Sequence, residues 1–208
     1  MPSLPITPSP AAGPGTPVSG HASGPAWGPL PASALLLTAM ALQLVRQGRI
    51  WWCACGRPSL WDGALWSAHT SQHLFDHYSL THVLHGILFC GLFWWLFPRL
   101  RYGWRLWGAL CLEALWELLE NTPWIIRRYR AVTIDKGYEG DSIANSIGDV
   151  GCCALGFVLA SRLGWKGSAA LFLAVELGLL IAVRDNLTLN VLMLLCPIEA
   201  VRQWQMGG

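Results

Sequence analysis

The chain has 208 residues, of which 53% are hydrophobic and only 12% are charged, and it contains 13 tryptophans. Soluble domains carry about twice that share of charged residues, so this composition indicates a membrane protein. The formal net charge is only +2 and the basic residues form no stripe, which excludes the nucleic-acid-binding class. The length suits one helical bundle, and we expect residues 30–208 to form a single membrane domain.

The N-terminal segment has a different composition. Residues 1–29 are rich in Pro, Gly, Ser and Ala and contain no Lys, Arg, Asp or Glu. Because such a segment cannot bury enough apolar surface to order itself, we expect a disordered tail. The first basic residue is Arg46, after the first apolar run, whereas a signal peptide has its positive charge before the run. We therefore expect residues 30–45 to remain as a helix.

Five apolar runs predict membrane-spanning helices, each long enough, or nearly so, to cross a hydrocarbon layer of about 30 Å. They begin near Leu30, Tyr78, Trp104, Ser142 and Ser168. The fold class is therefore an all-α polytopic membrane bundle of five to six transmembrane helices with interfacial segments. Residues 187–204 could form the sixth span, although Pro197 would kink it. In a chain that zigzags, the polar ends of these runs meet at one membrane face.

Polar residues gather at those ends. The second run carries His82 and His85 one turn apart, and the third carries Glu113, Glu117 and Glu120. Spacings of four and three place the three glutamates on one side of a helix. Carboxylates in an apolar helix need a proton, a cation or an arginine to offset their charge. This stripe is the main chemical signal in the chain.

The fourth run opens with a similar pattern. Asp141, Asn145 and Asp149 recur every fourth residue, so they share one helix face. Each has a structural alternative: a helix cap, an interhelical hydrogen bond and an arginine partner, respectively. The zigzag places this face beside the histidines and glutamates, and ionisable groups within a membrane indicate a functional site.

This combination of side chains predicts a divalent metal centre, with zinc, manganese, iron or magnesium as the candidate ions. The predicted metal ligands are His82, His85, Glu117, Glu120, Asp141 and Asp149. Glu113, Glu117 and Asp149 are the predicted catalytic residues, beside a metal that activates water or polarises a phosphate. The predicted substrate-binding residues are Arg127, Arg128, Arg130, Asn121, Asn145 and Arg184. Arginine pairs well with phosphate, although the three clustered arginines could instead anchor the chain at lipid headgroups.

The connector between the first two runs, residues 46–77, contains four tryptophans and is expected to lie along the bilayer surface. It also contains Cys53 and Cys55, followed by His69, His73 and His77 at every fourth position, which would share a helix face. Zinc sites usually use CxxC spacing, so CxC is a weak metal signal. A tight glycine turn with two small thiols is the alternative.

The basic residues leave the orientation of the bundle open. Connectors on the side of the polar cluster hold eight Lys or Arg, against five on the other side. This bias favours a cytoplasmic cluster, but arginines that bind substrate would distort the count.

Several strings together resemble a known family. They are Cys53-Ala54-Cys55-Gly56, HxxHG from His82 to Gly86, WExxEN from Trp116 to Asn121, GDSxxNSxxD from Gly140 to Asp149, and Arg184 to Asn190. The chain resembles the bacterial multi-pass membrane proteins of uncharacterised protein family 0314 over roughly residues 35 to 205. The resemblance implies a bacterial inner-membrane location and no particular activity.

Three functions fit these observations. The leading one is a metal-dependent membrane enzyme that acts on a lipid headgroup or isoprenoid phosphate, with membrane lipids as partners. The second is a proton-coupled or cation transporter or channel in which Glu176, in the middle of the fifth run, extends the polar path. The third is a structural or assembly factor whose polar cluster only locks helices together. The sequence identifies no protein partner.

Overall fold

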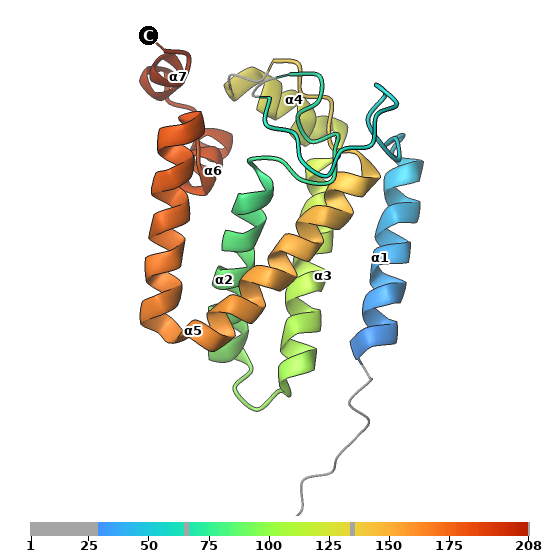
Figure 1. Cartoon of the computed structure of the whole chain (residues 1–208), viewed down its shortest axis with the longest axis vertical. Coiled ribbons are helices and arrows are strands. Elements are labelled where there is room, and N and C mark those ends of the chain that lie inside the picture. Colours follow the sequence, from blue (N-terminus) through green and yellow to red (C-terminus); the bar gives the residue numbers. More distant parts are fainter. Residues whose placement is uncertain (1–28, 65–66, 134–135, 208) are drawn as a thin grey trace, which may run out of the picture.

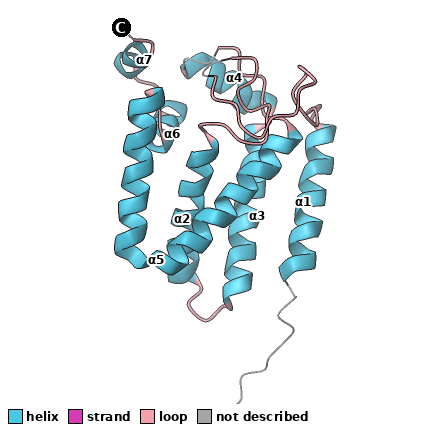
Figure 2. Ribbon diagram, viewed as in Figure 1, coloured by secondary structure: helices cyan, strands magenta, loops and turns pink. Residues whose placement is uncertain are grey.

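The computed structural model describes residues 29–64, 67–133 and 136–207, so the predicted tail lies almost entirely outside the described residues. The regular elements of the described part are all helices (Figures 1 and 2). They are α1 (Pro29–Arg46), α2 (Ser79–Leu96), α3 (Tyr102–Glu120), α4 (Pro123–Val132), α5 (Ile143–Val183), α6 (Leu187–Leu195) and α7 (Glu199–Gln205). The all-helical class predicted from the sequence is therefore correct.

The helices zigzag between two ends of the molecule (Figure 1). The connector at residues 47–78, α4, and the short helices α6 and α7 all lie at one end, which we call the polar end. The loop at residues 97–101 lies at the opposite end. As the apolar runs predict, the end of α3 and the starts of α2 and α5 come together at the polar end.

Helix α5 changes direction at Gly164. This residue has φ 66° and ψ −180°, a backbone conformation that essentially only glycine adopts. The arm at 143–163 runs away from the polar end and the arm at 165–183 returns to it (Figure 1). These arms correspond to the two separate runs that the sequence predicts near Ser142 and Ser168.

Three helices are long and apolar enough to cross a membrane, namely α1, α2 and α5, which is fewer than the five to six spans predicted. Helix α3 has 19 residues, but it carries Arg105 and three glutamates, so its composition is less apolar. The segment at 187–204 does not form one long helix. It folds as helices of nine and seven residues, and the first is only about 14 Å long.

Helices α2 and α5 cross closely because glycines lie at their contact. A methyl group on Gly86 would overlap the carbonyl oxygen of Cys153, and one on Gly156 would overlap the carbonyl oxygen of Val83. Small residues let two helix backbones approach in this way. The crossing fixes His82 on α2 relative to Asp149 on α5.

Two apolar clusters flank this crossing. One joins α1, α3 and the start of α5 through Met40, Ala41, Leu44, Leu110, Ala114, Ile143 and Val150. The other joins α2, α3, α5 and α6 through Leu84, Ile87, Cys90, Ala109, Phe157, Ala160 and Leu187. Between them they hold the three helices that carry the polar cluster in fixed positions.

The connector at 47–78 holds the start of α5. The first N–H groups of a helix lack partners within the helix. Here the N–H groups of Ser142, Ile143 and Ala144 donate to the carbonyl oxygens of Ser71, Ile50 and Trp51 at 2.9, 2.9 and 3.2 Å. The N-cap of α5 is Ser142, whose side chain accepts from the N–H of Asn145. The helix cap that the sequence offered as the structural alternative for Asp141 is therefore the next residue.

Candidate metal centre at the polar end

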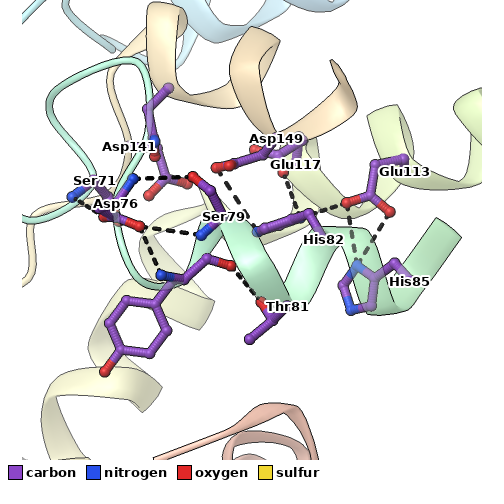
Figure 3. Close-up of polar contacts among 12 residues, drawn as sticks. Ser71, Asp76, Ser79, Thr81, His82, His85, Glu113, Glu117, Asp141 and Asp149 are labelled. Atoms are coloured by element: carbon purple, nitrogen blue, oxygen red, sulfur yellow. Dashed lines mark hydrogen bonds and ion pairs between the residues drawn. The ribbon is translucent and has the colours of Figure 1, made fainter. Parts of the chain in front are cut away.

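Three helices bring a histidine and three carboxylates together (Figure 3). His82 comes from the first turns of α2, Glu113 and Glu117 from the last turns of α3, and Asp149 from the second turn of α5. Their residues are 6, 0, 0 and 3% exposed, respectively. The convergence that the sequence predicts for these residues is present in the fold.

Glu113 orients both histidines. Its Oε1 lies 2.5 Å from Nδ1 of His82, and its two oxygens lie 3.1 Å from Nδ1 of His85. A carboxylate that holds one ring nitrogen of an imidazole fixes the ring and leaves the other nitrogen available for a metal. The Nε2 of His82 accordingly lies 3.7 Å from Oδ2 of Asp149.

Glu117 has a different setting, although it lies one turn from Glu113. Its Oε1 is 3.4 Å from Nδ1 of His82, yet neither carboxylate oxygen has a hydrogen-bond partner. One oxygen of Asp149 and both polar side-chain atoms of Asn145 are also buried without a partner. Buried polar atoms are nearly always satisfied, and an unpaired buried carboxylate is costly. The oxygen atoms in this group have the capacity to bind a cation, whereas the amide nitrogen of Asn145 can only donate.

Two sets of three side chains bring ligand atoms within 4.8 Å of one another, and both include His82. One set adds His85 and Glu113, and the other adds Glu117 and Asp149. Nitrogen and carboxylate oxygen together suit zinc, iron and manganese. The geometry best supports the second set as the ligand set, because Glu113 is already engaged by both histidines.

A pocket with an empty volume of about 710 Å³, including its open mouth, adjoins this cluster at the polar end. Its polar lining includes Thr70, Ser71, Tyr78, Thr81, His82, His85, Glu120, Tyr129, Thr133, Tyr138, Asp141, Asp149, Asp185 and Asn190. Its apolar lining includes Trp116, Leu187 and Val191. Among the described residues, no lysine or arginine lines the pocket.

Glu120 and Asp141 lie on the pocket rather than in either ligand set. Asp141 is held by Asn121, whose Nδ2 donates to Oδ2 at 2.8 Å, and by the hydroxyl of Tyr138, which donates to Oδ1 at 2.9 Å. Burial raises the pKa of Asp141, and these two hydrogen bonds oppose the rise. Asn121 thus positions Asp141, and it also donates to the carbonyl oxygen of Glu117 at 3.0 Å.

The predicted substrate-binding arginines make other contacts. The Nε of Arg128 donates to the carbonyl oxygen of Leu194 at 2.9 Å, and the Nε of Arg130 donates to that of Tyr138 at 2.5 Å. Arg127 is exposed, and Arg184 donates to the carbonyl oxygen of Trp204 at 3.2 Å. Arg128, Arg130 and Arg184 thus connect segments at the polar end, and none of the four arginines lines the pocket.

Sequence reasoning missed the tyrosines of the pocket. The hydroxyl of Tyr129 donates to Oδ1 of Asn190 at 2.7 Å, and that of Tyr78 donates to Oδ2 of Asp185 at 3.3 Å. Burial raises the pKa of Asp185 to about 6, while four hydrogen-bond donors oppose the rise. Burial also raises the pKa of Tyr129 and, with nearby Asp141, that of Tyr138. No spacing in the sequence marks these residues, because they come from separate elements.

Comparison with known proteins assigns this chain to a family. Residues 44–207 match the family described as "Protein of unknown function (DUF2585)". The chain is 46% identical over 183 residues to a UPF0314 protein of Paracoccus denitrificans, covering 88% of this chain and 93% of that protein. It is 46% identical over 176 residues to a UPF0314 protein of Sphingopyxis alaskensis, covering 85% and 94%.

A UPF0314 protein of Rhizobium meliloti is 47% identical over 174 residues, with 82% of this chain and 88% of that protein covered. No solved structure matches the chain. The resemblance noted from the motifs is thus confirmed, and the chain belongs to the UPF0314 family.

Proposed function

We propose that this protein is a metal-dependent membrane enzyme that acts on a phosphate group of a lipid, either a headgroup phosphate or an isoprenoid phosphate. The observation that carries the proposal is Glu117. This carboxylate is fully buried beside His82, and neither of its oxygens has a hydrogen-bond partner. Asp149 faces the same imidazole from α5. A divalent cation would satisfy these atoms together.

Each side chain has a role in this proposal. His82, Glu117 and Asp149 would hold the metal, and Glu113 is a positioning residue that aligns His82 and His85. Bound there, a divalent metal supplies Lewis acidity and lowers the pKa of a coordinated water. His85 lines the pocket and is aligned by Glu113, so it can accept a proton from a reacting group.

The lining of the pocket defines the substrate class. The hydroxyl protons of Tyr78 and Tyr138 are already donated to Asp185 and Asp141. The hydroxyl of Thr70 accepts the N–H of Ser67 and still has a proton to donate to a phosphate oxygen, while Trp116 and Leu187 provide apolar surface for a lipid chain. Because no described lysine or arginine lines the pocket, the charge of a phosphate would be balanced by the metal. Phosphate binding should therefore require the metal.

We further propose a five-span arrangement in a bacterial inner membrane. The spans are α1, α2, α3 and the two arms of α5, and α4, α6 and α7 lie at the interface of the polar end. Glu113 and Glu117 of α3 are fully buried against neighbouring helices, so these two carboxylates do not meet lipid. The arginines of α4 and the exposed Trp51 and Trp61 suit the headgroup layer.

The test is elemental analysis followed by an activity assay. The detergent-purified full chain, prepared without chelator and with added divalent ions, should contain bound metal that a folded Glu117→Ala/Asp149→Ala variant lacks. An Arg127→Ala variant is the control, because this exposed residue belongs to neither the ligand set nor the pocket lining. The metal-loaded protein should release phosphate from a panel of lipid phosphates and isoprenoid diphosphates. Equal metal content in wild type and the double variant would overturn the proposal.

A cation transporter is the second candidate. The pocket favours it, because carboxylates line the pocket and no described lysine or arginine does. The role expected of Glu176 does not fit, because its carboxylate accepts from the N–H groups of Leu187 and Thr188 at 2.9 and 3.3 Å. It thus caps α6 rather than extending a polar path. Uptake of the bound cation into proteoliposomes, without phosphate release from any lipid, would favour transport over catalysis.

A further inference from the structure

The connector at 47–78 contains a second group of metal-ligand side chains, away from the proposed active site. The predicted helix face that His69, His73 and His77 would share is not formed. His77 instead packs edge-on against Trp61, with ring centroids 5.4 Å apart. His69 and His73 turn toward Cys53 and Cys55, and ligand atoms of these four side chains lie within 4.8 Å of one another.

The contacts within this group match the edges of a zinc tetrahedron. Sγ of Cys53 lies 3.3 Å from Nδ1 of His69, which lies 3.4 Å from Nε2 of His73. Zinc–nitrogen bonds of about 2.0 Å and zinc–sulfur bonds of about 2.3 Å place neighbouring tetrahedral ligands roughly 3.3 to 3.8 Å apart. The side chains are therefore already close to a ligating arrangement.

Hydrogen bonds within the group do not satisfy these atoms. Nδ1 of His69 faces both Cys53 and His73, yet an imidazole nitrogen offers one proton or one lone pair. His73, whose Nε2 faces this nitrogen, is only 5% exposed. Cys53 is 6% exposed and also receives the N–H of Cys55 at 3.4 Å. A cation bound by all four side chains would end this competition, because Nδ1 of His69 would then give its lone pair to the cation.

We infer that Cys53, Cys55, His69 and His73 form a structural zinc site. Two thiolates and two imidazoles are a common zinc ligand set, and soft sulfur ligands select zinc over magnesium or manganese. The four ligands close a tetrahedral site without an open position. This inference is independent of the proposed function, because the two ligand sets share no residue.

The zinc would cross-link the two connector segments that hold α5. Trp51, two residues before Cys53, accepts the N–H of Ala144, and Ser71, two residues before His73, accepts the N–H of Ser142. Zinc between Cys53 and His73 would thus fix two of the three backbone acceptors at the start of α5, the helix that carries Asp149. Thr70 and Ser71 also line the pocket, so the zinc would stabilise its wall.

The experiment measures zinc in the detergent-purified full chain, isolated under reducing conditions without chelator. A Cys53→Ser/Cys55→Ser variant should contain one zinc fewer per chain than wild type. The matched control is Cys196→Ser, which changes an exposed cysteine outside the group and should keep the wild-type zinc content. The Glu117→Ala/Asp149→Ala variant should also keep this zinc, which separates a failure of this site from a failure of the proposed active site.

Cobalt provides a readout on the wild-type chain, in case the cysteine variants do not fold. Cobalt(II) substituted into wild type should show a sulfur-to-cobalt charge-transfer band in the near ultraviolet, because both thiolates would ligate the metal. Zinc should also protect two thiols from alkylation, and mass spectrometry should identify them as Cys53 and Cys55. Absence of the band together with full alkylation of both cysteines in zinc-loaded protein would overturn the inference, as would unchanged zinc in a folded cysteine variant.

Discussion

At the scale of single residues, Glu113 and Glu117 show how the same side chain serves two purposes one helical turn apart. Glu113 engages the Nδ1 atoms of both His82 and His85, so its charge is satisfied by hydrogen bonds. Glu117 is equally buried but has no hydrogen-bond partner. One carboxylate therefore supports the fold of the site, and the other is the one that we propose to bind a cation.

This contrast predicts opposite effects of two matched substitutions on metal-free protein. Glu117→Gln should leave the free energy of unfolding unchanged or raise it by about 1 to 3 kcal/mol, because it replaces a buried carboxyl group whose oxygens have no hydrogen-bond partner. Glu113→Gln should lower it by about 2 to 3 kcal/mol, because it weakens hydrogen bonds to two histidines. Thermal unfolding in detergent with a chelator present measures both.

Added divalent metal provides the control for these variants. Wild type should gain thermal stability on metal addition, because a ligand that binds only the folded state stabilises it. Glu117→Gln should gain less, because added metal can then bind only at the proposed connector site. If Glu117→Gln destabilises the metal-free protein as much as Glu113→Gln does, Glu117 is a structural residue.

At the scale of elements, the crossing of α2 and α5 sets the geometry of the cluster. The crossing depends on Gly86 and Gly156, each of which lies against a backbone carbonyl of the other helix. A side chain at either position would force the helices apart, which would move His82 away from Asp149. Packing of small residues, rather than a direct bond between these two side chains, therefore holds the site together.

Gly86→Ala and Gly156→Ala should each lower the free energy of unfolding by about 1 to 3 kcal/mol, because they overpack the crossing. Gly91→Ala on α2 and Gly151→Ala on α5 are the controls, since nothing lies within 4 Å of a methyl group at either position. The controls should be neutral or stabilising, because alanine favours helix. Thermal unfolding and metal content report the effect on fold and site. Equal losses of unfolding free energy in all four variants would show that overpacking at the crossing is not the cause.

At the scale of the whole molecule, the number of spans determines where the termini lie. The start of α1 and the end of α7 lie at opposite ends of the molecule (Figure 1). Five spans place the two termini on opposite sides of a membrane, whereas six would place them on the same side. The short helices α6 and α7 are the reason that we expect five.

Terminal tags test this arrangement. In sealed membrane vesicles of one orientation, protease should remove a tag from one terminus and leave a tag at the other terminus intact. Vesicles of the opposite orientation should give the reverse result, which serves as the internal control. Removal of both tags from the same vesicles would contradict the five-span arrangement. The result would also decide which side of the membrane the polar end faces.

The sequence alone predicts much of the fold, because helix periodicity and apolar length are local properties. The two runs of α5 are visible on either side of Gly164. The meeting of His82, Glu113, Glu117 and Asp149 follows from their positions near the ends of consecutive runs. Family membership also follows from the sequence, because it depends on the order of residues.

Only the tertiary structure decides how these residues differ in role. It assigns Glu113 to the histidines and leaves Glu117 without a hydrogen-bond partner, and it turns Arg128 and Arg130 toward the backbone carbonyls of Leu194 and Tyr138. It also brings Cys53 to His69 across a connector that has no regular period. The physical reason is that hydrogen-bond partners and metal ligands from separate segments are selected by packing, whereas sequence periodicity specifies only one face of one element.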